Sequence, residues 1–282
     1  MASRSAKVMD MAELEREERK CQLGRLRPGV VVYADILGFR RMCDPGRSPI
    51  EPLKALAAIR ALRPETDETP AVQIHFYVLG DSFVRVLLLQ PDLEQEGPWD
   101  AVERRQMLWA VDAQASFCSR GHLVQGGVAT GLVYSNLVKA TVYGPALCRA
   151  IELKSEKARS SGIAVDDEIA KRHAGDFHWL ERQDETWFID YLGLPPFLAG
   201  RRDTAIVPWL KRLEQHKNAV RDYYRASQDE KQRARCKRMI LHHNRKVESM
   251  LRPASNPAPG IEDVRARIEA CRIEDLANSG DR

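Results

Sequence analysis

Two acidic residues lie where expected strands end in turns. Asp35 follows the apolar run Val30–Ala34, and Asp81 lies in the Gly-Asp turn of an expected β-hairpin over residues 71–90. A carboxylate on an apolar strand is costly to bury unless it is paired or bound to a metal ion. Two adjacent strands can bring both carboxylates together, and such a pair suits Mg²⁺ or Mn²⁺ ions that hold a triphosphate for in-line displacement. The alternative is that Asp81 is an ordinary turn residue and Asp35 a cap.

The turn Gly38-Phe39, which follows Asp35 closely, offers a second part of the same site. Backbone N–H groups at the start of a helix bind phosphate oxygens. The turn alone is a weak signal. Beside two aspartates it predicts a combined site for metal ions and phosphates.

The elements that must position these residues alternate between strands and helices. The expected strands are 30–39, the two arms of the 71–90 hairpin, 124–134, 163–165 and a strand or hairpin over 179–192. The expected helices are 9–23, 51–62, 100–119, 145–158, 168–174, 204–226, 229–251 and 261–276. Hairpins mixed with helices predict an α+β sandwich with helices on one face of a mainly antiparallel sheet, plus C-terminal helices.

The composition limits the class of protein. Hydrophobic residues make up 44% of the 282 residues, which is enough for a real core and excludes a wholly disordered chain. The longest apolar runs are far shorter than a membrane-spanning helix needs. The start of the chain has no apolar signal segment, and the six cysteines are scattered without a metal-binding spacing, so we expect a cytoplasmic protein.

Basic charge is concentrated near the C-terminus. Residues 201–252 contain 15 Lys or Arg and 6 Asp or Glu, whereas the whole chain carries a net charge of only +4. A solvated helical face explains this pattern, and a contact with phosphates or an acidic partner is the alternative. The stretch carries no base-reading motif, so no nucleic acid partner is expected.

Four segments occur in the order found in class III nucleotidyl cyclases, and each resembles a motif of that family. The segments are Tyr33–Phe39, Leu79–Ser82, Gln125–Gly131 and Val142–Leu147, and the resemblance covers about residues 29–175. It implies a cyclase-like sandwich in which the ribose 3′-oxygen of a nucleoside triphosphate attacks the α-phosphate and pyrophosphate leaves. It also implies that Asp35, Asp81 and the backbone carbonyl of Ile36 hold two Mn²⁺ or Mg²⁺ ions, and that Phe39 and its neighbours hold phosphates.

Departures from the purine cyclases fall on the base-reading positions. Tyr77 stands where Lys or Glu commonly reads the base, and Thr141 occupies the second such position. A tyrosine ring there narrows the base pocket and favours a smaller base; the alternative for Tyr77 is a core aromatic residue. These features resemble the pyrimidine cyclases of the bacterial Pycsar antiphage system, which make cyclic UMP or cyclic CMP with Mn²⁺ for a separate effector protein. The resemblance leaves UTP and CTP open, because a tyrosine hydroxyl both donates and accepts.

Three further departures lie on the helix after residue 145. The Asn and Arg of the family that stabilise the ribose and triphosphate fall on Cys148 and Glu152. Arg149 is one candidate for the missing arginine, because a guanidinium matches phosphate oxygens; the alternative is that it points to solvent. Lys154 stands where the family pattern leads us to expect Glu.

The resemblance implies a homodimer whose active sites take metal-binding aspartates from one chain and base-reading residues from the other. The expected parts are an N-terminal helical extension (1–28), the catalytic domain (29–198) and a C-terminal helical region and tail (199–282). Uridylate cyclisation is the first hypothesis and cytidylate cyclisation the second. A purine cyclase and a catalytically dead nucleotide-binding regulator are further alternatives, the latter because the usual Asn and Arg are missing.

Overall fold

A computed structural model of the chain describes residues 26–62, 72–89, 99–157, 162–193, 207–227, 229–251 and 261–273. The expected helix 9–23 lies outside these residues, as does most of the expected N-terminal extension. In the described part of the chain, no helix is long and apolar enough to cross a membrane.

The centre of the fold is an eight-stranded sheet with the order β2-β3-β1-β4-β6-β8-β7, and β5 pairs with β4 beside this path. Its strands are β1 (Arg27–Ile36), β2 (Val72–Leu79), β3 (Ser82–Leu89), β4 (Val124–Asn136), β5 (Thr141–Tyr143), β6 (Ile163–Val165), β7 (Leu180–Gln183) and β8 (Thr186–Ile189). All neighbouring strands are antiparallel except the parallel pair β4 and β6. The mainly antiparallel α+β fold is therefore confirmed.

The described helices match the expected ones with three differences, one of which is that the helix expected over 261–276 ends at Ala270. The helices are α2 (Phe39–Met42), α3 (Ile50–Ala61), α4 (Trp99–Ser119), α5 (Pro145–Glu152), α6 (Asp167–His173), α7 (Val207–Ala226), α8 (Glu230–Leu251) and α9 (Ile261–Ala270). The strand expected over 30–39 ends at Ile36, because Gly38 has a positive φ of 78° and α2 follows at once. The helix expected over 145–158 changes after Glu152 into a π-helical turn, Leu153–Lys157.

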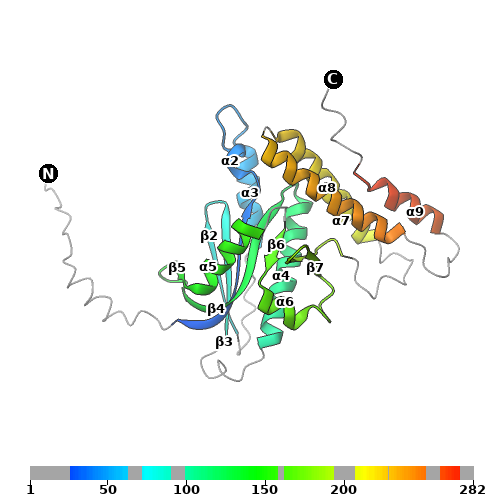
Figure 1. Cartoon of the computed structure of the whole chain (residues 1–282). Helices are drawn as coiled ribbons and strands as arrows, with labels where there is room; N and C mark the ends of the chain where they lie inside the picture. The colour runs from blue at the N-terminus through cyan, green and yellow to red at the C-terminus, as the bar shows by residue number, and fades with distance from the viewer. Residues whose placement is uncertain are drawn as a thin grey trace, which may run out of the picture.

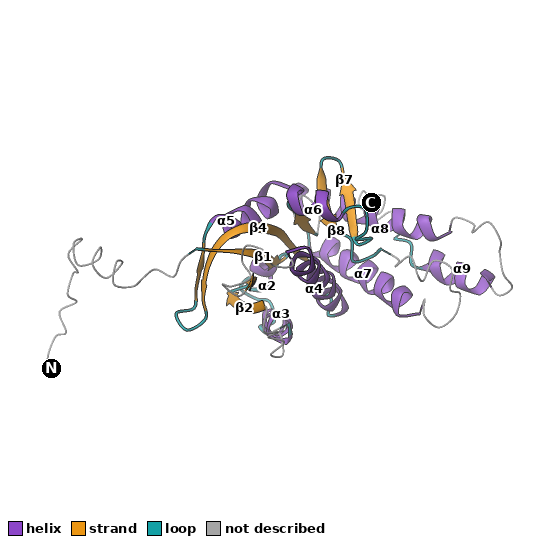
Figure 2. Ribbon diagram, turned by 90° about the horizontal axis from the view of Figure 1, so that it is seen from below, coloured by secondary structure: helices purple, strands orange, loops and turns teal. Residues whose placement is uncertain are grey.

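Helices cover both faces of the sheet rather than the one face expected. Val30 and Val32 of β1 belong to the core cluster that includes α3, α4 and α7, whereas Val31 belongs to a second cluster that includes α5. Successive side chains of a strand point to opposite faces, so α5 lies across the sheet from α4 (Figure 2). Hydrophobic periodicity identifies a helix but does not say which face of a sheet it will cover.

Helix α5 lies very close to the sheet because strand β4 carries glycine where they meet. A Cβ atom added to Gly127 would lie 2.2 Å from the backbone oxygen of Ala150 in α5. Only glycine accommodates that distance, so Gly127 fixes how closely α5, and the π-helical turn after it, approach the sheet.

The C-terminal helices α7 and α8 lie side by side next to the core (Figure 1). The Trp209 indole N–H donates to the backbone oxygen of Leu192 at 3.0 Å. Lys246 of α8 lies 2.6 Å from Asp190, a buried carboxylate whose pKa is lowered by His242 and Lys246 against the opposing effect of burial. The helical region therefore packs on the sheet domain, and the expected division near residue 198 stays a prediction.

Two buried histidines join α7, α8 and the segment after α9. Nδ1 of His216 lies 2.9 Å from Nδ1 of His243, and Nε2 of His243 lies 2.8 Å from the backbone oxygen of Cys271. A carbonyl only accepts, so His243 donates from Nε2 and accepts at Nδ1 from His216. Burial lowers the pKa of His243 to about 4 and the pKa of His216 well below its ordinary value. Both rings are therefore neutral at pH 7.

This histidine pair makes the stability of the fold depend on pH. Its contribution is present above the unfolded-state pKa of about 6.5 and is lost as pH falls towards the lowered folded-state values, because the unfolded chain takes up the protons first. For His243 we expect a loss of about 1.4 kcal/mol per pH unit in the window from about pH 6 down to pH 4, and His216 adds to this loss in the same direction. Urea unfolding at several pH values measures this slope. The double variant His216→Gln/His243→Gln should show a smaller slope, and an unchanged slope would assign the pH dependence to other groups.

Candidate active site at the end of strand β1

Asp35 lies at the end of the central strand β1, where its Cα pairs with Ser82 of β3 and Gln125 of β4. Its side chain is 13% exposed. Oδ1 is buried and has no hydrogen-bond partner among the described residues. An unpartnered buried carboxylate oxygen is unfavourable by itself and is suited to bind a cation.

Asp81 lies beside Asp35, in the turn that joins β2 and β3. The backbone oxygen of Asp81 accepts a hydrogen bond from the Ile36 N–H at 3.1 Å, which fixes the turn against the end of β1. Burial raises the pKa of the Asp35 carboxyl, and the nearby charge of Asp81 raises it further. The structure therefore places the two residues at neighbouring positions, close enough for their charges to interact, and their role as metal ligands remains a prediction. A cation between them would favour the charged form of both.

Lys154 is the residue that the sequence analysis did not connect with this site. Its Nζ atom lies 2.5 Å from Oδ2 of Asp35 and 5.7 Å from the ring centroid of Tyr33. Its ammonium lowers the pKa of Asp35, against the larger effect of burial. Lys154 belongs to the π-helical turn after α5, and such turns frequently occur at functional sites. A single sequence gives no signal for a π-helical turn. The one feature of the sequence that distinguished position 154 was a lysine where the family pattern leads us to expect Glu.

The turn after Asp35 leads directly into the short helix α2. The Leu37 N–H donates to the backbone oxygen of Leu123 at 2.8 Å, and Gly38 adopts the left-handed region with φ of 78°. Phe39 begins the short helix α2 and packs partly buried against the core. A phosphate-binding role for Phe39 remains a prediction.

Helix α7 packs against the turn at Gly38. A Cβ atom added to Gly38 would lie 3.0 Å from the ring of Tyr223. Arg41 of α2 donates to the backbone oxygen of Ala226 and lies over the Tyr223 ring at 5.1 Å. A cavity of about 470 Å³ lies between α2, α3, the α4–β4 turn and α7. The C-terminal helices therefore contact the turn that follows Asp35.

The two expected base-reading residues come close to each other on the strands β2, β4 and β5. The Tyr77 hydroxyl lies 2.8 Å from Oγ of Ser135, and Asn136, the next residue of β4, is the Cα partner of Thr141. Tyr77 is 5% exposed and packs in the cluster that includes α5, so within one chain it is also a core aromatic residue. Thr141 donates to the backbone oxygen of Lys139 at 2.9 Å. Roles for Tyr77 and Thr141 in reading a base remain predictions.

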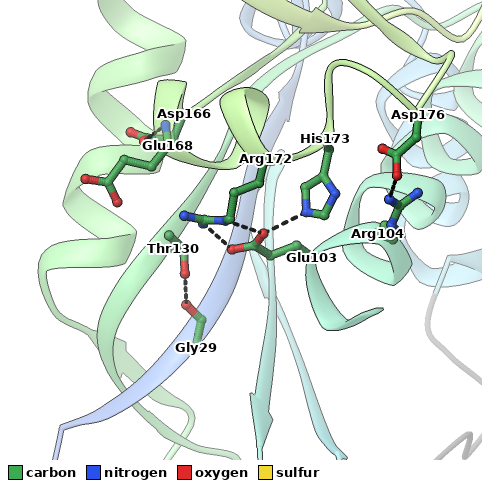
Figure 3. Close-up of polar contacts among 9 residues, drawn as sticks. All are labelled: Gly29, Glu103, Arg104, Thr130, Asp166, Glu168, Arg172, His173 and Asp176. Atoms are coloured by element: carbon green, nitrogen blue, oxygen red, sulfur yellow. Dashed lines mark hydrogen bonds and ion pairs between the residues drawn. The ribbon is translucent and has the colours of Figure 1, made fainter. Parts of the chain in front are cut away.

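Arg149 has carboxylate partners that lie away from the two aspartates. Its Nε donates to Oδ2 of Asp166 at 2.8 Å, and its guanidinium lies 3.6 Å from Glu152. Asp166 also accepts from the Glu168 N–H and caps α6 (Figure 3). Within one chain the structure therefore places Lys154, not Arg149, next to Asp35.

Two other groups of side chains have the composition of a metal site. They are Asp100, Glu103 and His173, and Glu181, Asp190 and His242. Glu103 is buried and already accepts from Arg172 and His173, which joins α4 to α6 (Figure 3). Lys246 lies 2.6 Å from both Glu181 and Asp190. Glu103, Glu181 and Asp190 thus have protein cations as partners, so these carboxylates are explained as ion-pair clusters that join elements of the fold.

The comparisons with known proteins give structural neighbours only. No protein-family model matches the chain, and no curated protein is similar to it. The monomeric guanylyl cyclase domain of the RhoGC fusion protein from the aquatic fungus Blastocladiella emersonii is 16% identical, with a TM-score of 0.41 over 58% of this chain and 95% of that chain. A bacterial light-regulated adenylyl cyclase is 12% identical, with a TM-score of 0.40 over 67% of this chain and 57% of its own. Both likenesses are distant.

The contact between Gly38 and Tyr223 gives a testable prediction. Gly38→Ala should lower the free energy of unfolding by more than Gly46→Ala, measured by urea denaturation. Both positions have a positive φ, which costs a residue with a Cβ about 1–2 kcal/mol, but a Cβ on Gly46 would meet nothing within 4 Å. Gly46→Ala is therefore the matched control for backbone strain. Equal losses in the two variants would show that Tyr223 does not hold the turn.

Proposed function

We propose that the chain is a nucleotide cyclase that converts UTP to cyclic UMP and pyrophosphate, as a second-messenger synthase in bacterial antiviral defence. Its product would act on a separate effector protein. Cytidylate cyclisation of CTP is the second candidate, because the Tyr77 hydroxyl is able to donate to one base or accept from the other.

One observation carries the proposal: Asp35 and Asp81 lie together at the end of β1, beside the Gly38 turn. The unpartnered Oδ1 of Asp35 supplies a hard oxygen for a divalent cation, so the donor set fits Mn²⁺ or Mg²⁺. Asp35, Asp81 and the Ile36 carbonyl would hold two such ions. When bound, the ions would lower the pKa of the attacking hydroxyl and neutralise charge on the phosphates.

The residues of the chain divide the remaining work. The backbone after Asp35 would hold the terminal phosphates, and the aspartates, through the ions they hold, would position the α-phosphate relative to the ribose. Tyr77 would limit the size of the base, because its ring is held by the cluster under α5 and its hydroxyl by Ser135. These contacts would give a base pocket there a rigid wall, which would favour a pyrimidine.

The direct test is to incubate the purified protein with Mn²⁺ and each of ATP, GTP, CTP and UTP, and to identify products by mass spectrometry. We expect cyclic UMP from UTP. Asp35→Asn and Asp81→Asn should each lower the rate by more than about 100-fold, because losing even a group that orients a metal ligand costs about 10–100-fold. Glu152→Gln, on the neighbouring helix, is a control that should keep both metal-binding carboxylates.

The other outcomes of this test are informative. Cyclic CMP would move the proposal to its second candidate, and a cyclic purine would show that Tyr77 does not select the base. Tight nucleotide binding without any product would favour the catalytically dead regulator, for which the ion pair of Lys154 with Asp35 is the supporting observation.

We also propose that the active protein is a homodimer with shared sites. Exposed apolar side chains come from the elements around Tyr77 and Thr141: Val78, Leu79, Leu132, Tyr143 and Ile151. Exposed apolar residues on adjoining strands and a helix suit a contact with a second copy of the chain. Such a contact would complete each site with the partner's base-reading residues.

A mixing experiment tests the shared site. Asp35→Ala and Tyr77→Ala homodimers should each be inactive, and their equimolar mixture should regain roughly a quarter of the wild-type rate, because half of the dimers then contain one intact site of two. Mixing Asp35→Ala with the double variant Asp35→Ala/Tyr77→Ala is the control and should regain nothing. Circular dichroism should first confirm that the Tyr77 variant folds. An inactive first mixture of folded chains would contradict the shared site.

A further inference from the structure

Lys154 holds one of the two carboxylate oxygens of Asp35, the candidate metal ligand. Its ammonium lies 2.5 Å from Oδ2 of Asp35, while the other carboxylate oxygen, Oδ1, is buried without a partner. The chain therefore already neutralises the carboxylate of Asp35 with a cation of its own. The neighbouring carboxylate of Asp81 has no ion pair with a described residue.

We infer that Lys154 competes with the divalent cation for Asp35, and that the nucleoside triphosphate relieves this competition by giving the displaced ammonium a new anionic partner. The inference rests on the proposed function for its second half only. Metal and nucleotide would then bind cooperatively, and Lys154 would be the positioning residue that couples them.

Electrostatics requires the displacement. A divalent ion on Asp35 would come within a few ångströms of the Lys154 ammonium, and like charges at such a separation repel strongly where water screens them poorly. The ammonium must therefore leave Oδ2 for the metal to bind well. Without another anion nearby, the ammonium that leaves Oδ2 loses its ion pair with Asp35, which is partly shielded from water.

The surroundings of Lys154 allow this movement. The side chain is 21% exposed, and its ammonium lies near the Tyr33 ring. A cation over an aromatic ring is stabilised by that ring, so the ammonium would remain partly stabilised after it left Oδ2. The backbone at this point is the π-helical turn rather than a regular helix. A triphosphate bound between the Gly38 turn and the aspartates would place several negative charges within reach of the released ammonium.

Thermodynamic linkage turns this arrangement into a measurable coupling. If the triphosphate gives Lys154 a new partner, it raises metal affinity, and the metal raises triphosphate affinity by the same factor. Removing the ammonium should therefore do two things at once. It should tighten metal binding in the absence of nucleotide, and it should reduce the gain that nucleotide adds.

The experiment is a titration of Mn²⁺ at pH 8, with free Mn²⁺ followed by electron paramagnetic resonance. Without nucleotide, Lys154→Met should bind Mn²⁺ at least about fivefold more tightly than wild type, at the lower end of couplings between sites. Lys154→Arg keeps the charge and should bind as wild type does. Lys171→Met removes a lysine from the exposed surface of α6 and is the matched control, with no expected change.

A second titration adds a UTP analogue with a methylene group between the α- and β-phosphorus atoms, which does not cyclise. Wild type should gain Mn²⁺ affinity on its addition, and Lys154→Met should gain less. A Lys154→Met protein that folds but binds Mn²⁺ no more tightly than wild type without nucleotide would overturn the competition. Equal gains from the analogue in the two proteins would overturn the coupling.

The two proposals fail in different ways. If wild type makes no cyclic product and does not respond to the analogue, while Lys154→Met still tightens Mn²⁺ binding, the competition stands and the cyclase function fails. If wild type makes cyclic UMP and Lys154→Met leaves Mn²⁺ affinity unchanged, the function stands and the inference about Lys154 fails.

Discussion

The charge of Asp35 in the central strand is the constraint on which the site depends. The backbone groups around it pair with β3 and β4, so compensation for its carboxylate has to come from side chains above the sheet. Gly127 permits α5 to lie against β4, and the π-helical turn after α5 then places Lys154 over the carboxylate. A glycine with no chemistry of its own thus determines which cation reaches Asp35.

The C-terminal helices also support the candidate site. Tyr223 of α7 contacts Gly38, and Arg41 joins α2 to the end of α7 through Ala226. The turn that would hold phosphates is therefore supported by a segment more than 180 residues later in the chain. This contact gives part of the basic region a structural role, which the charge pattern by itself did not indicate.

The sequence predicts the β-rich runs and the hairpin, because alternation and a Gly-Asp turn are local signals. It allows the proximity of Asp35 and Asp81 without requiring it, because that proximity depends on the pairing of β1 with the distant strand β3. It does not predict that α5 covers the face of the sheet opposite to α4, since the period of a helix carries no information about which face of a sheet the helix covers. Nor does it predict the contact of Lys154, because a π-helical turn changes the direction of a side chain without changing the residue pattern. The roles of Tyr77, Thr141 and Arg149 depend on a second chain and a substrate, so they remain predictions.

The charges on α5 and on the turn after it are divided between two sets of partners. Arg149 of α5 pairs with Glu152 and with Asp166, which lie away from the two aspartates. Lys154, in the π-helical turn, pairs with Asp35. The change from α-helix to π-helix after Glu152 therefore separates a cation that neutralises carboxylates of the fold from a cation that neutralises the candidate metal ligand. Because the second cation is built into the chain, the charge of Asp35 is compensated by the fold itself.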